Sequence, residues 1–224
     1  MKNLNVFSVF SSLNGEVNLY HQGSQATFLR LAGCNLSSCN WCDTSYALKE
    51  TDGKERTIED VASEIKRFDN SIITITGGEP LLQEEAVMDL INYLGNSFVF
   101  SIETNGSIVP RLVGGRRNVS LVMDWKLFSS GMESKMNLDA FSSLTDQDFV
   151  KFVVKNREDF EEAVWMKSIL KDSSGCEAKF VFSPVIGELK PSTLASFFEE
   201  YEVKDAILNL QLHKIIWENS PIER

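Results

Sequence analysis

The sequence predicts an α/β protein built on parallel strands, and three observations support this fold class. Short runs rich in β-branched and aromatic residues alternate with amphipathic helical stretches, which is typical of repeated strand–helix units. Polar residues or glycines directly follow several of these runs, as expected where parallel strands end. With 224 residues, 43% of them hydrophobic, the chain is long enough to bury one large core. We therefore expect one domain over residues 1–224.

The N-terminal part begins with a strand-like stretch. Residues 5–20 contain an apolar run followed by an Asn14-Gly15 pair, which together favour an edge strand and a hairpin turn. Residues 27–31 form the first strand of the expected parallel set and deliver Arg30 just ahead of a cysteine-rich loop. A guanidinium group can donate two parallel hydrogen bonds, so Arg30 is suited to bind a planar carboxylate.

The rest of the chain alternates strands with helices. The expected strands span residues 71–76, 98–102, 121–125, 149–154, 179–182 and 206–212. The expected helices span residues 57–68, 83–94, 158–171 and 191–201. The first of these helices opens with a capping box at residues 57–60, and its apolar residues recur at helical spacing. The strand at 71–76 is rich in β-branched residues, as is typical of a buried parallel strand.

The cysteine-rich loop spans residues 34–44. Cys34, Cys39 and Cys42 lie within nine residues, and such crowding indicates a soft metal centre. Three thiolates can hold three corners of a 4Fe-4S cluster and leave one iron open to another ligand. The alternatives are a disulfide loop, a zinc site completed by a distant ligand, and chance. No secretory signal is evident, which disfavours the disulfide, and we expect Cys176 to be a small hydrophobe.

Residues with polar chemistry follow the expected strands one after another. Gly77-Gly78-Glu79-Pro80 ends one strand; its glycines let the backbone approach a ligand, and Glu79 can accept hydrogen bonds from an ammonium group. A tight strand–helix connection is the plain alternative for this turn. In an α/β barrel, the loops at the carboxyl ends of parallel strands meet at one mouth. We expect six residues to meet there: Cys34, Gly78, Glu103, Lys126, Ser183 and His213.

Charge and hydropathy argue against a nucleic-acid-binding protein and against a membrane-spanning one. The formal net charge of −10 and the pI near 4.8 disfavour a nucleic-acid binder, which would need clustered Lys and Arg. No apolar run approaches the roughly 18 residues of a membrane span. We therefore expect a soluble, cytoplasmic protein.

Residues 30–36 and 39–44, read as R-L-A-G-C-N-L and C-N-W-C-D-T, resemble the cluster loop of radical S-adenosylmethionine enzymes. Together with the Gly-Gly-Glu-Pro turn and the Gln-Leu-His-Lys segment at 211–214, they are most similar to 7-carboxy-7-deazaguanine synthases. Four residues separate Cys34 from Cys39, where the superfamily commonly has three, and this family is known for inserts of variable length here. The resemblance spans residues 13–214 and implies an abbreviated, partly open (β/α)6 radical S-adenosylmethionine barrel.

The resemblance also implies a role for each site residue. The 4Fe-4S cluster would be bound by Cys34, Cys39 and Cys42, and Mg²⁺ by Thr44. S-adenosylmethionine would be bound by Gly77, Gly78, Glu79, Asp124, Trp125, Lys126 and Ser183. The pterin substrate would be bound by Leu13, Asn14, Gly15, Glu16, Arg30, Thr76, Glu103 and His213. Arg30, Glu103 and His213 are the expected catalytic residues. Asn14 stands where the family has glutamine, and Phe128 replaces a proline.

In the resembled family, a radical formed from S-adenosylmethionine takes a hydrogen atom from 6-carboxy-5,6,7,8-tetrahydropterin. Ring contraction and loss of ammonia then give 7-carboxy-7-deazaguanine, a precursor of queuosine- and archaeosine-type nucleosides. The implied partners are a flavodoxin- or ferredoxin-like electron donor and a second copy of the chain in a homodimer. The alternatives are an enzyme that generates a glycyl radical on a protein partner, and a non-enzymatic iron–sulfur or zinc sensor or adaptor. The sequence leaves open whether the tail at 215–224 covers the site.

Overall fold

The structure, a computed structural model, describes residues 2–36 and 39–217. Its centre is one sheet, in which the described strands follow the order β3-β1-β2-β4-β5-β6-β7-β8-β9. The strands are β1 (Leu4–Leu13), β2 (Gln25–Leu31), β3 (Lys54–Arg56), β4 (Ile72–Gly77), β5 (Val99–Thr104), β6 (Val119–Trp125), β7 (Phe149–Val154), β8 (Lys179–Pro184) and β9 (Ala206–Leu208). Neighbouring strands from β2 to β9 pair in parallel, whereas β1 pairs antiparallel with both β2 and β3.

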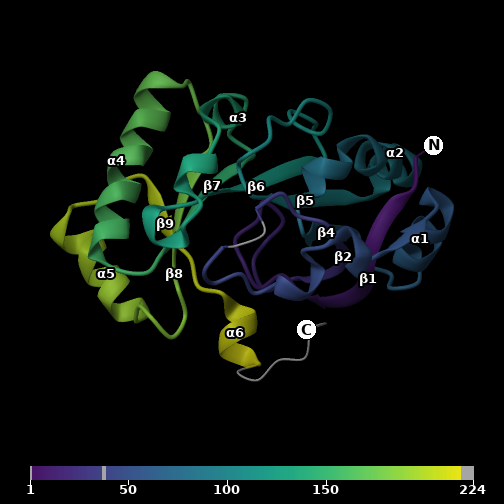
Figure 1. The fold of residues 1–224 in the computed structure, drawn as a ribbon, viewed down its shortest axis with the longest axis horizontal. Coiled ribbons are helices and arrows are strands. Elements are labelled where there is room, and N and C mark those ends of the chain that lie inside the picture. Colours follow the sequence, from purple (N-terminus) through teal and green to yellow (C-terminus); the bar gives the residue numbers. More distant parts are fainter. Residues whose placement is uncertain (1, 37–38, 218–224) are drawn as a thin grey trace.

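Helices flank this sheet along its length. The helices are α1 (Ile58–Lys66), α2 (Glu84–Leu94), α3 (Leu138–Ser142), α4 (Arg157–Ser173), α5 (Pro191–Glu200) and α6 (Leu212–Ile216). Short 3-10 turns occur at Ser45–Ala47, Glu50–Asp52, Pro80–Gln83, Gly95–Ser97, Phe128–Ser130 and Glu133–Lys135. Helices α1 and α2 lie at one end of the sheet and α4 and α5 at the other (Figure 1). None of the helices in the described part of the chain is both long and apolar enough to cross a membrane.

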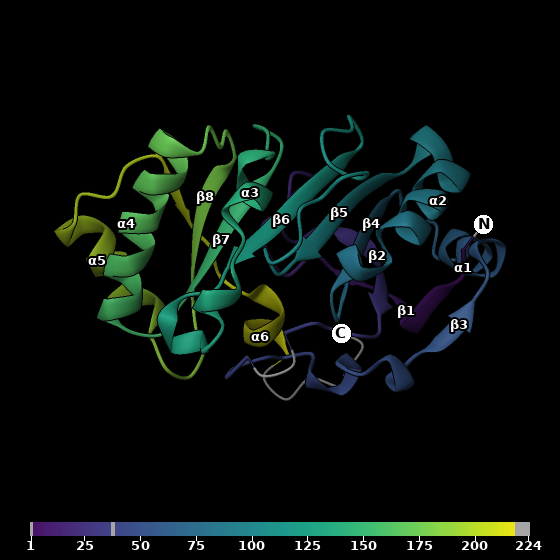
Figure 2. The ribbon, with the colours of Figure 1, turned by 45° about the horizontal axis from the view of Figure 1, so that its top comes forward.

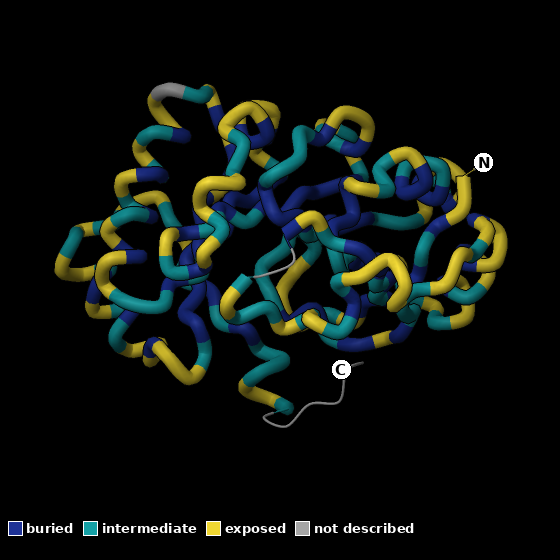
Figure 3. Tube along the Cα trace, in the orientation of Figure 1, coloured by how far each residue is buried: buried dark blue, intermediate teal, exposed yellow. Residues whose placement is uncertain are grey.

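Side chains alternate between the two faces of each strand, as the two-residue period of a strand requires. In β7, Val150 and Phe152 pack into the main hydrophobic core beneath the helices, whereas Lys151 and Val153 line a cavity on the opposite face. The other parallel strands divide in the same way, and the dark blue of the buried residues runs through the centre of the molecule (Figure 3). The outer face of the sheet thus stabilises the fold, and the inner face is free to carry polar groups.

The predicted α/β fold is confirmed. Six parallel strands, β2 and β4 to β8, have six or seven residues each, and the three-residue β9 extends the described sheet without closing it. The strand predicted at residues 206–212 ends instead at Leu208, and α6 begins at Leu212. The chain leaves the sheet here because the buried side chains of Asn209 and Gln211 turn inward to hydrogen-bond other side chains.

The connection between β1 and β2 differs from the predicted hairpin turn. Residues 14–24 form a long loop whose ends are joined by backbone hydrogen bonds between Asn14 and Gly23 (2.7 Å) and between Asn14 and Ser24 (2.8 Å). Val17 and Leu19 of this loop pack against a second apolar cluster on the inner face, formed by Val122, Phe149 and Val181. The loop therefore covers part of the inner face. Strand β1 is not at the edge of the sheet, because β3 pairs outside it.

Two segments named in the sequence predictions lie partly outside the described residues. These are residues 37–38, within the gap between Cys34 and Cys39, and residues 218–224, which make up most of the predicted tail.

Candidate active site

A cavity of about 590 Å³ opens at the carboxyl ends of the parallel strands. All three loop cysteines line it, together with Arg30 from β2 and Glu103 from β5. The loop that carries the cysteines and helix α6 lie along the same edge of the sheet (Figure 2). The strand ends thus bring most of the predicted site residues together in one place, although they are far apart in the sequence.

The cysteine loop is anchored to the Gly-Gly-Glu-Pro turn through backbone contacts. The N–H group of Gly78 donates to the carbonyl of Leu31 at 2.9 Å, and that of Glu79 donates to the carbonyl of Gly33 at 2.8 Å. A Cβ atom on Gly78 would overlap the carbonyl oxygen of Gly33. Gly77 has a φ of +120°, and a Cβ there would overlap the backbone of Leu31. Both glycines are therefore required by the packing of the turn against the start of the cysteine loop.

The thiols provide a donor set that fits an iron–sulfur cluster. The Cys34 sulfur accepts hydrogen bonds from the N–H group of Leu36 (3.4 Å) and from the side-chain amide of Asn105 (3.8 Å). Burial raises the pKa of all three loop thiols, and the Lys126 ammonium opposes this rise at Cys39 and Cys42. Amide donors and a nearby cation stabilise metal-bound thiolates. Three sulfurs facing one cavity therefore match the ligands of a cluster with one open iron.

Glu79 lies behind the wall of this cavity. Its carboxylate is 1% exposed and accepts hydrogen bonds from Leu81 N–H (2.9 Å), the Thr104 hydroxyl (2.7 Å) and Asn105 N–H (2.7 Å). Burial raises its pKa. The side chain thus holds the Gly-Gly-Glu-Pro turn against the end of β5. The three donors that it binds are groups of the protein, whereas the sequence predicted an ammonium group of a ligand.

Two further residues predicted to contact S-adenosylmethionine do not line the cavity. Successive side chains of a strand point to opposite faces, so Trp125 points away from the face that carries Asp124 and Lys126. Its indole faces the helices and packs against Phe141, with ring centroids 5.0 Å apart. Ser183 is fully buried, and its hydroxyl accepts a hydrogen bond from the side chain of Asn209 at 2.8 Å. Val185, just beyond it, lines the cavity.

Arg30 lies within a column of aromatic rings. Its guanidinium carbon is 5.0 Å from the ring centroid of Phe10 and 5.3 Å from that of Tyr46. Phe28 stacks beyond Phe10 at 5.2 Å, and Phe7 lies beyond Tyr46 at 5.1 Å. Rings over the planar faces of a guanidinium leave its N–H edges for hydrogen bonding, which suits recognition of a carboxylate.

Glu103 and Asn14 occupy different polar environments. The Thr76 hydroxyl donates to Glu103 at 2.6 Å, and both residues line the cavity. Burial and the nearby Glu16 carboxylate raise the pKa of Glu103 to about 7. Asn14 also lines the cavity, but the residue is only 3% exposed and its side chain is engaged by Thr74 (2.6 Å) and Ser24 (3.3 Å). The shorter amide at this position therefore holds the loop in place at the cavity wall.

The C-terminal segment docks on the loop after β1. The imidazole of His213 packs so closely on Gly15 that any Cβ there would overlap it, and Leu212 N–H donates to the Gly15 carbonyl at 2.8 Å. The side chain of Gln211 donates to Glu16 at 2.7 Å. Burial lowers the pKa of His213. The two ends of the predicted substrate site thus meet in space, with Leu13, Gly15, Glu16 and His213 all lining the cavity.

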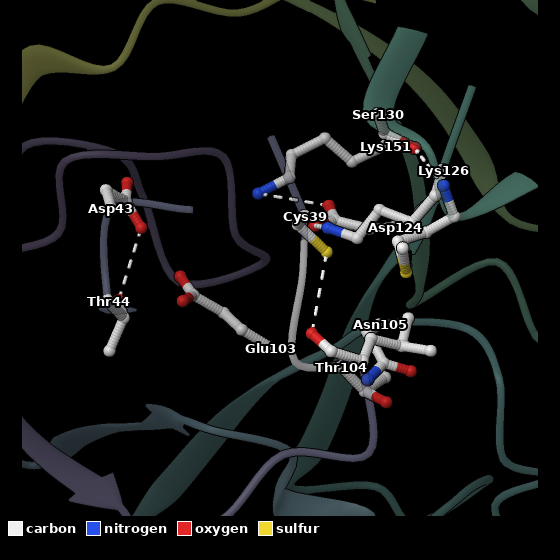
Figure 4. A network of polar contacts seen from close by, with 12 residues as sticks. Cys39, Asp43, Thr44, Glu103, Thr104, Asn105, Asp124, Lys126, Ser130 and Lys151 are labelled. Atoms are coloured by element: carbon white, nitrogen blue, oxygen red, sulfur yellow. Dashed lines mark hydrogen bonds and ion pairs between the residues drawn. The ribbon is translucent and has the colours of Figure 1, made fainter. Parts of the chain in front are cut away.

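Thr44 lies at the rim beside acidic and basic groups. Its hydroxyl donates to Asp43 at 3.2 Å, as Figure 4 shows, and Asp43 pairs with Lys214 at 3.1 Å. Glu16, Asp43 and His213 each present a possible metal-ligand atom, and these atoms lie within 4.8 Å of one another. Lys151 and Lys214 already neutralise the two carboxylates, which weakens this group as a cation site.

Lys151 is the main cavity residue that the sequence predictions missed. It comes from the middle of β7, is 6% exposed, and pairs with Glu16 (2.6 Å) and Asp124 (3.2 Å). Figure 4 shows its ammonium group directed toward Asp124, which also binds Lys126. A lysine inside an otherwise apolar strand was the available signal, because buried lysines are rare unless they are paired.

The open parallel sheet and the three thiols at its mouth are features of radical S-adenosylmethionine enzymes. Residues 29–116 match the model of the Radical SAM superfamily. The crystal structure of QueE from Escherichia coli has the same fold, with a TM-score of 0.73 over 94% of this chain and 95% of that one, at 23% identity.

Curated relatives narrow this class to one family. A 7-carboxy-7-deazaguanine synthase from Clostridium acetobutylicum is 37% identical over 220 residues, which cover 96% of each chain. The synthase from Methanospirillum hungatei is 35% identical and covers 95% of this chain and 85% of its own. The one from Chlorobaculum tepidum is 33% identical over 96% of this chain and 94% of its own. The chain belongs to the 7-carboxy-7-deazaguanine synthase family and is an enzyme that uses a 4Fe-4S cluster and S-adenosylmethionine.

Proposed function

We propose that this enzyme converts 6-carboxy-5,6,7,8-tetrahydropterin to 7-carboxy-7-deazaguanine with loss of ammonia, as a step toward deazapurine nucleosides. The observation that supports this most directly is that one cavity holds both the three thiols and two groups suited to a carboxylated pterin, Arg30 and Glu103. Its volume of about 590 Å³ lies in the range of small-molecule sites.

On one side of the cavity, Cys34, Cys39 and Cys42 would hold the cluster. When bound, the cluster and S-adenosylmethionine supply the radical that takes a hydrogen atom from the substrate. The exposed backbone of Gly77 and Gly78, which line the cavity, would contact S-adenosylmethionine, and Asp124 and Lys126 offer an acceptor and a donor for its polar groups. Glu79 would act through the turn, since its carboxylate already binds three protein donors.

On the other side, Arg30 would bind the substrate carboxylate with the edge of its guanidinium. Glu103, held by Thr76, would accept hydrogen bonds from the N–H groups of the pterin. Leu13, Gly15, Glu16 and His213 would complete this wall, and Thr44 would contribute its hydroxyl to a Mg²⁺ ion that also binds substrate oxygens. The chain's contribution is to hold the reacting atoms in place and to exclude water from the radical.

The two alternative functions have less support. An enzyme that activates a protein partner would leave Arg30, Glu103 and residues 211–214 without a role. A sensor or adaptor would need neither these groups nor a cavity of this size. The match to curated synthases over 96% of both chains favours chemistry on a small molecule.

The proposal extends to the partners of the enzyme. A low-potential donor such as a flavodoxin or ferredoxin would reduce the cluster, and the chain would work as a cytoplasmic homodimer. Light scattering of the purified protein tests the dimer, and reduction of the cluster by each candidate donor tests the electron source.

The function is tested by anaerobic reconstitution with iron and sulfide, followed by incubation with the carboxylated tetrahydropterin, S-adenosylmethionine, Mg²⁺ and dithionite. We expect mass spectrometry to detect 7-carboxy-7-deazaguanine and ammonia. Cleavage of S-adenosylmethionine without any conversion of the pterin would indicate a different substrate. A preparation that binds one zinc and no sulfide would end the radical interpretation.

A further inference from the structure

We propose that Lys151 is a positioning residue that links the pterin side of the cavity to the S-adenosylmethionine side. Its ammonium group lies 2.6 Å from Glu16 on the first side and 3.2 Å from Asp124 on the second. The inference rests on the proposed function, which assigns these two sides.

The contacts of Lys151 continue in both directions. The second carboxylate oxygen of Glu16 accepts a hydrogen bond from Gln211 at 2.7 Å, at the start of α6. The second carboxylate oxygen of Asp124 binds Lys126 at 2.5 Å. Five side chains thus form a continuous series of polar contacts: Gln211, Glu16, Lys151, Asp124 and Lys126. It runs from the C-terminal segment, across β7, to the end of β6.

The charges explain why a lysine is needed at this point. Glu16 and Asp124 have side-chain exposures of only 11% and 17%, and Lys151 itself has 8%. The Glu103 carboxyl adds a third acidic group nearby. The surrounding carboxylates outweigh burial and keep the pKa of Lys151 well above its ordinary value, so it stays charged. Without this cation, Asp124 would keep Lys126 as its partner, but Glu16 would keep only the neutral Gln211, and the two poorly solvated carboxylates would repel each other.

The arrangement matters for radical chemistry because hydrogen transfer depends on the distance between two separately bound molecules. Reacting atoms must come within about 3–3.5 Å, and an error of 1 Å can cost about 100-fold in rate. A cation shared by one carboxylate from each side fixes the two sides relative to each other. A lysine that only stabilised the fold would affect unfolding, without changing how often cleavage of S-adenosylmethionine leads to product.

The test compares five reconstituted enzymes, of which four are wild type, Lys151→Met, Lys151→Arg and the double variant Glu16→Gln/Lys151→Met. Lys171→Met is the matched control, because Lys171 is an exposed lysine of α4 that pairs with Asp205 on the surface. Two quantities are measured. The first is the ratio of 5′-deoxyadenosine released to deazaguanine acid formed. The second is the dissociation constant of the fluorescent oxidised analogue 6-carboxypterin, with and without S-adenosylmethionine, on unreduced enzyme.

We expect Lys151→Met to raise the ratio of 5′-deoxyadenosine to product about tenfold or more, since the two bound molecules lose their fixed spacing. We also expect S-adenosylmethionine to tighten pterin-analogue binding in the wild type and to lose this effect in Lys151→Met. Lys171→Met should stay within about twofold of the wild type. Lys151→Arg keeps the cation but changes its size and geometry, so it should restore only part of the coupling that Lys151→Met loses. The double variant removes one buried charge of each sign and should fold if Lys151→Met does not, and we expect it to be uncoupled as well.

A folded Lys151→Met or double variant with the wild-type ratio would overturn the inference, as would a wild type in which S-adenosylmethionine leaves pterin binding unchanged. These results leave the proposed function intact provided that the wild type converts the pterin. A wild type that cleaves S-adenosylmethionine but never converts the pterin refutes the proposed function, and the assignment of the two sides fails with it.

Discussion

The imidazole of His213 lies directly on the Cα of Gly15, so that residues almost 200 positions apart in the sequence form one wall of the cavity. The neighbouring hydrogen bond from Leu212 to the Gly15 carbonyl holds α6 in this position. The absence of a side chain at residue 15 is what allows the C-terminal segment to dock there.

We therefore expect Gly15→Ala to displace His213 and to raise the KM for the pterin about tenfold or more, because small displacements at a site are costly. Gly114→Ala is the matched control, since a Cβ at residue 114 would meet only ordinary van der Waals contacts. Steady-state kinetics of both variants check this. A Gly15→Ala enzyme with the wild-type KM would show that the docking of α6 has no part in substrate binding.

The aromatic rings around Arg30 predict a second effect. Tyr46→Leu removes one of the two rings over the guanidinium, an interaction worth about 0.5–2 kcal/mol. We expect the KM for the pterin to rise by roughly 2- to 30-fold, with little change in uncoupled cleavage of S-adenosylmethionine. Tyr93→Leu is the control, because Tyr93 makes a similar contact with Lys66 on the surface of α2.

Arg30 itself should be more sensitive than its neighbours. Arg30→Lys keeps the charge but loses the bidentate geometry, and Arg30→Ala loses both. We expect product formation to fall in the order wild type, lysine variant, alanine variant, while both variants still cleave S-adenosylmethionine. Equal loss of cleavage and product formation in Arg30→Ala would mean that Arg30 serves the fold rather than the substrate.

Glu79 should matter for the stability of the fold. Its carboxylate accepts three hydrogen bonds from buried protein donors, and an amide would turn donor groups toward some of them. We expect Glu79→Gln to lower the free energy of unfolding by about 1–3 kcal/mol. Urea denaturation of the cluster-free protein measures this, with Glu199→Gln on the exposed surface of α5 as the control. Equal stability of the two variants would show that the Glu79 carboxylate does not hold the turn to the end of β5.

The raised pKa of Glu103 predicts a pH dependence. Burial and Glu16 raise this pKa to about 7, so the carboxyl group is protonated below pH 7 and ionised above it. The carboxylate is the stronger acceptor for N–H groups, so binding of 6-carboxypterin should tighten as pH rises from 6 to 8. The stability of the ligand-free protein should change in the opposite sense, because the folded state holds this proton more tightly than the unfolded chain. Fluorescence titrations of wild type and Glu103→Gln check the pH dependence of 6-carboxypterin binding. The affinity of the variant should not change with pH over this range.

Much of the fold could be predicted from the sequence because its signals are local. The β-branched runs and amphipathic helices gave the order of the elements, and the residues after each strand indicated where the cavity opens. The loop at 14–24 was missed because the Asn14-Gly15 pair resembles an ordinary turn, whereas the packing of Val17 and Leu19 depends on strands more than 100 residues away. The end of β9 was missed for a similar reason, since it depends on the partners of Asn209 and Gln211.

In the candidate site, too, some residues could be predicted from the local sequence, and others depend on partners that are distant in the sequence. Arg30, Glu103 and Asp124 line the cavity because the side chains at these positions alternate toward the inner face of the sheet. Trp125 falls on the opposite face, and Ser183 is covered by Asn209, which motifs alone do not reveal. Lys151 lies inside a strand and in no motif, so only its partners in space mark it as part of the site.

We propose that S-adenosylmethionine and a carboxylated pterin meet in one cavity, which is bounded by Cys34, Cys39, Cys42, Arg30 and Glu103. Incubation with a pterin deuterated on its reduced ring tests this most directly. We expect deuterium to appear in 5′-deoxyadenosine or in recovered S-adenosylmethionine while the deazaguanine acid forms. Formation of 5′-deoxyadenosine that carries no deuterium, with the pterin recovered unchanged, would contradict it.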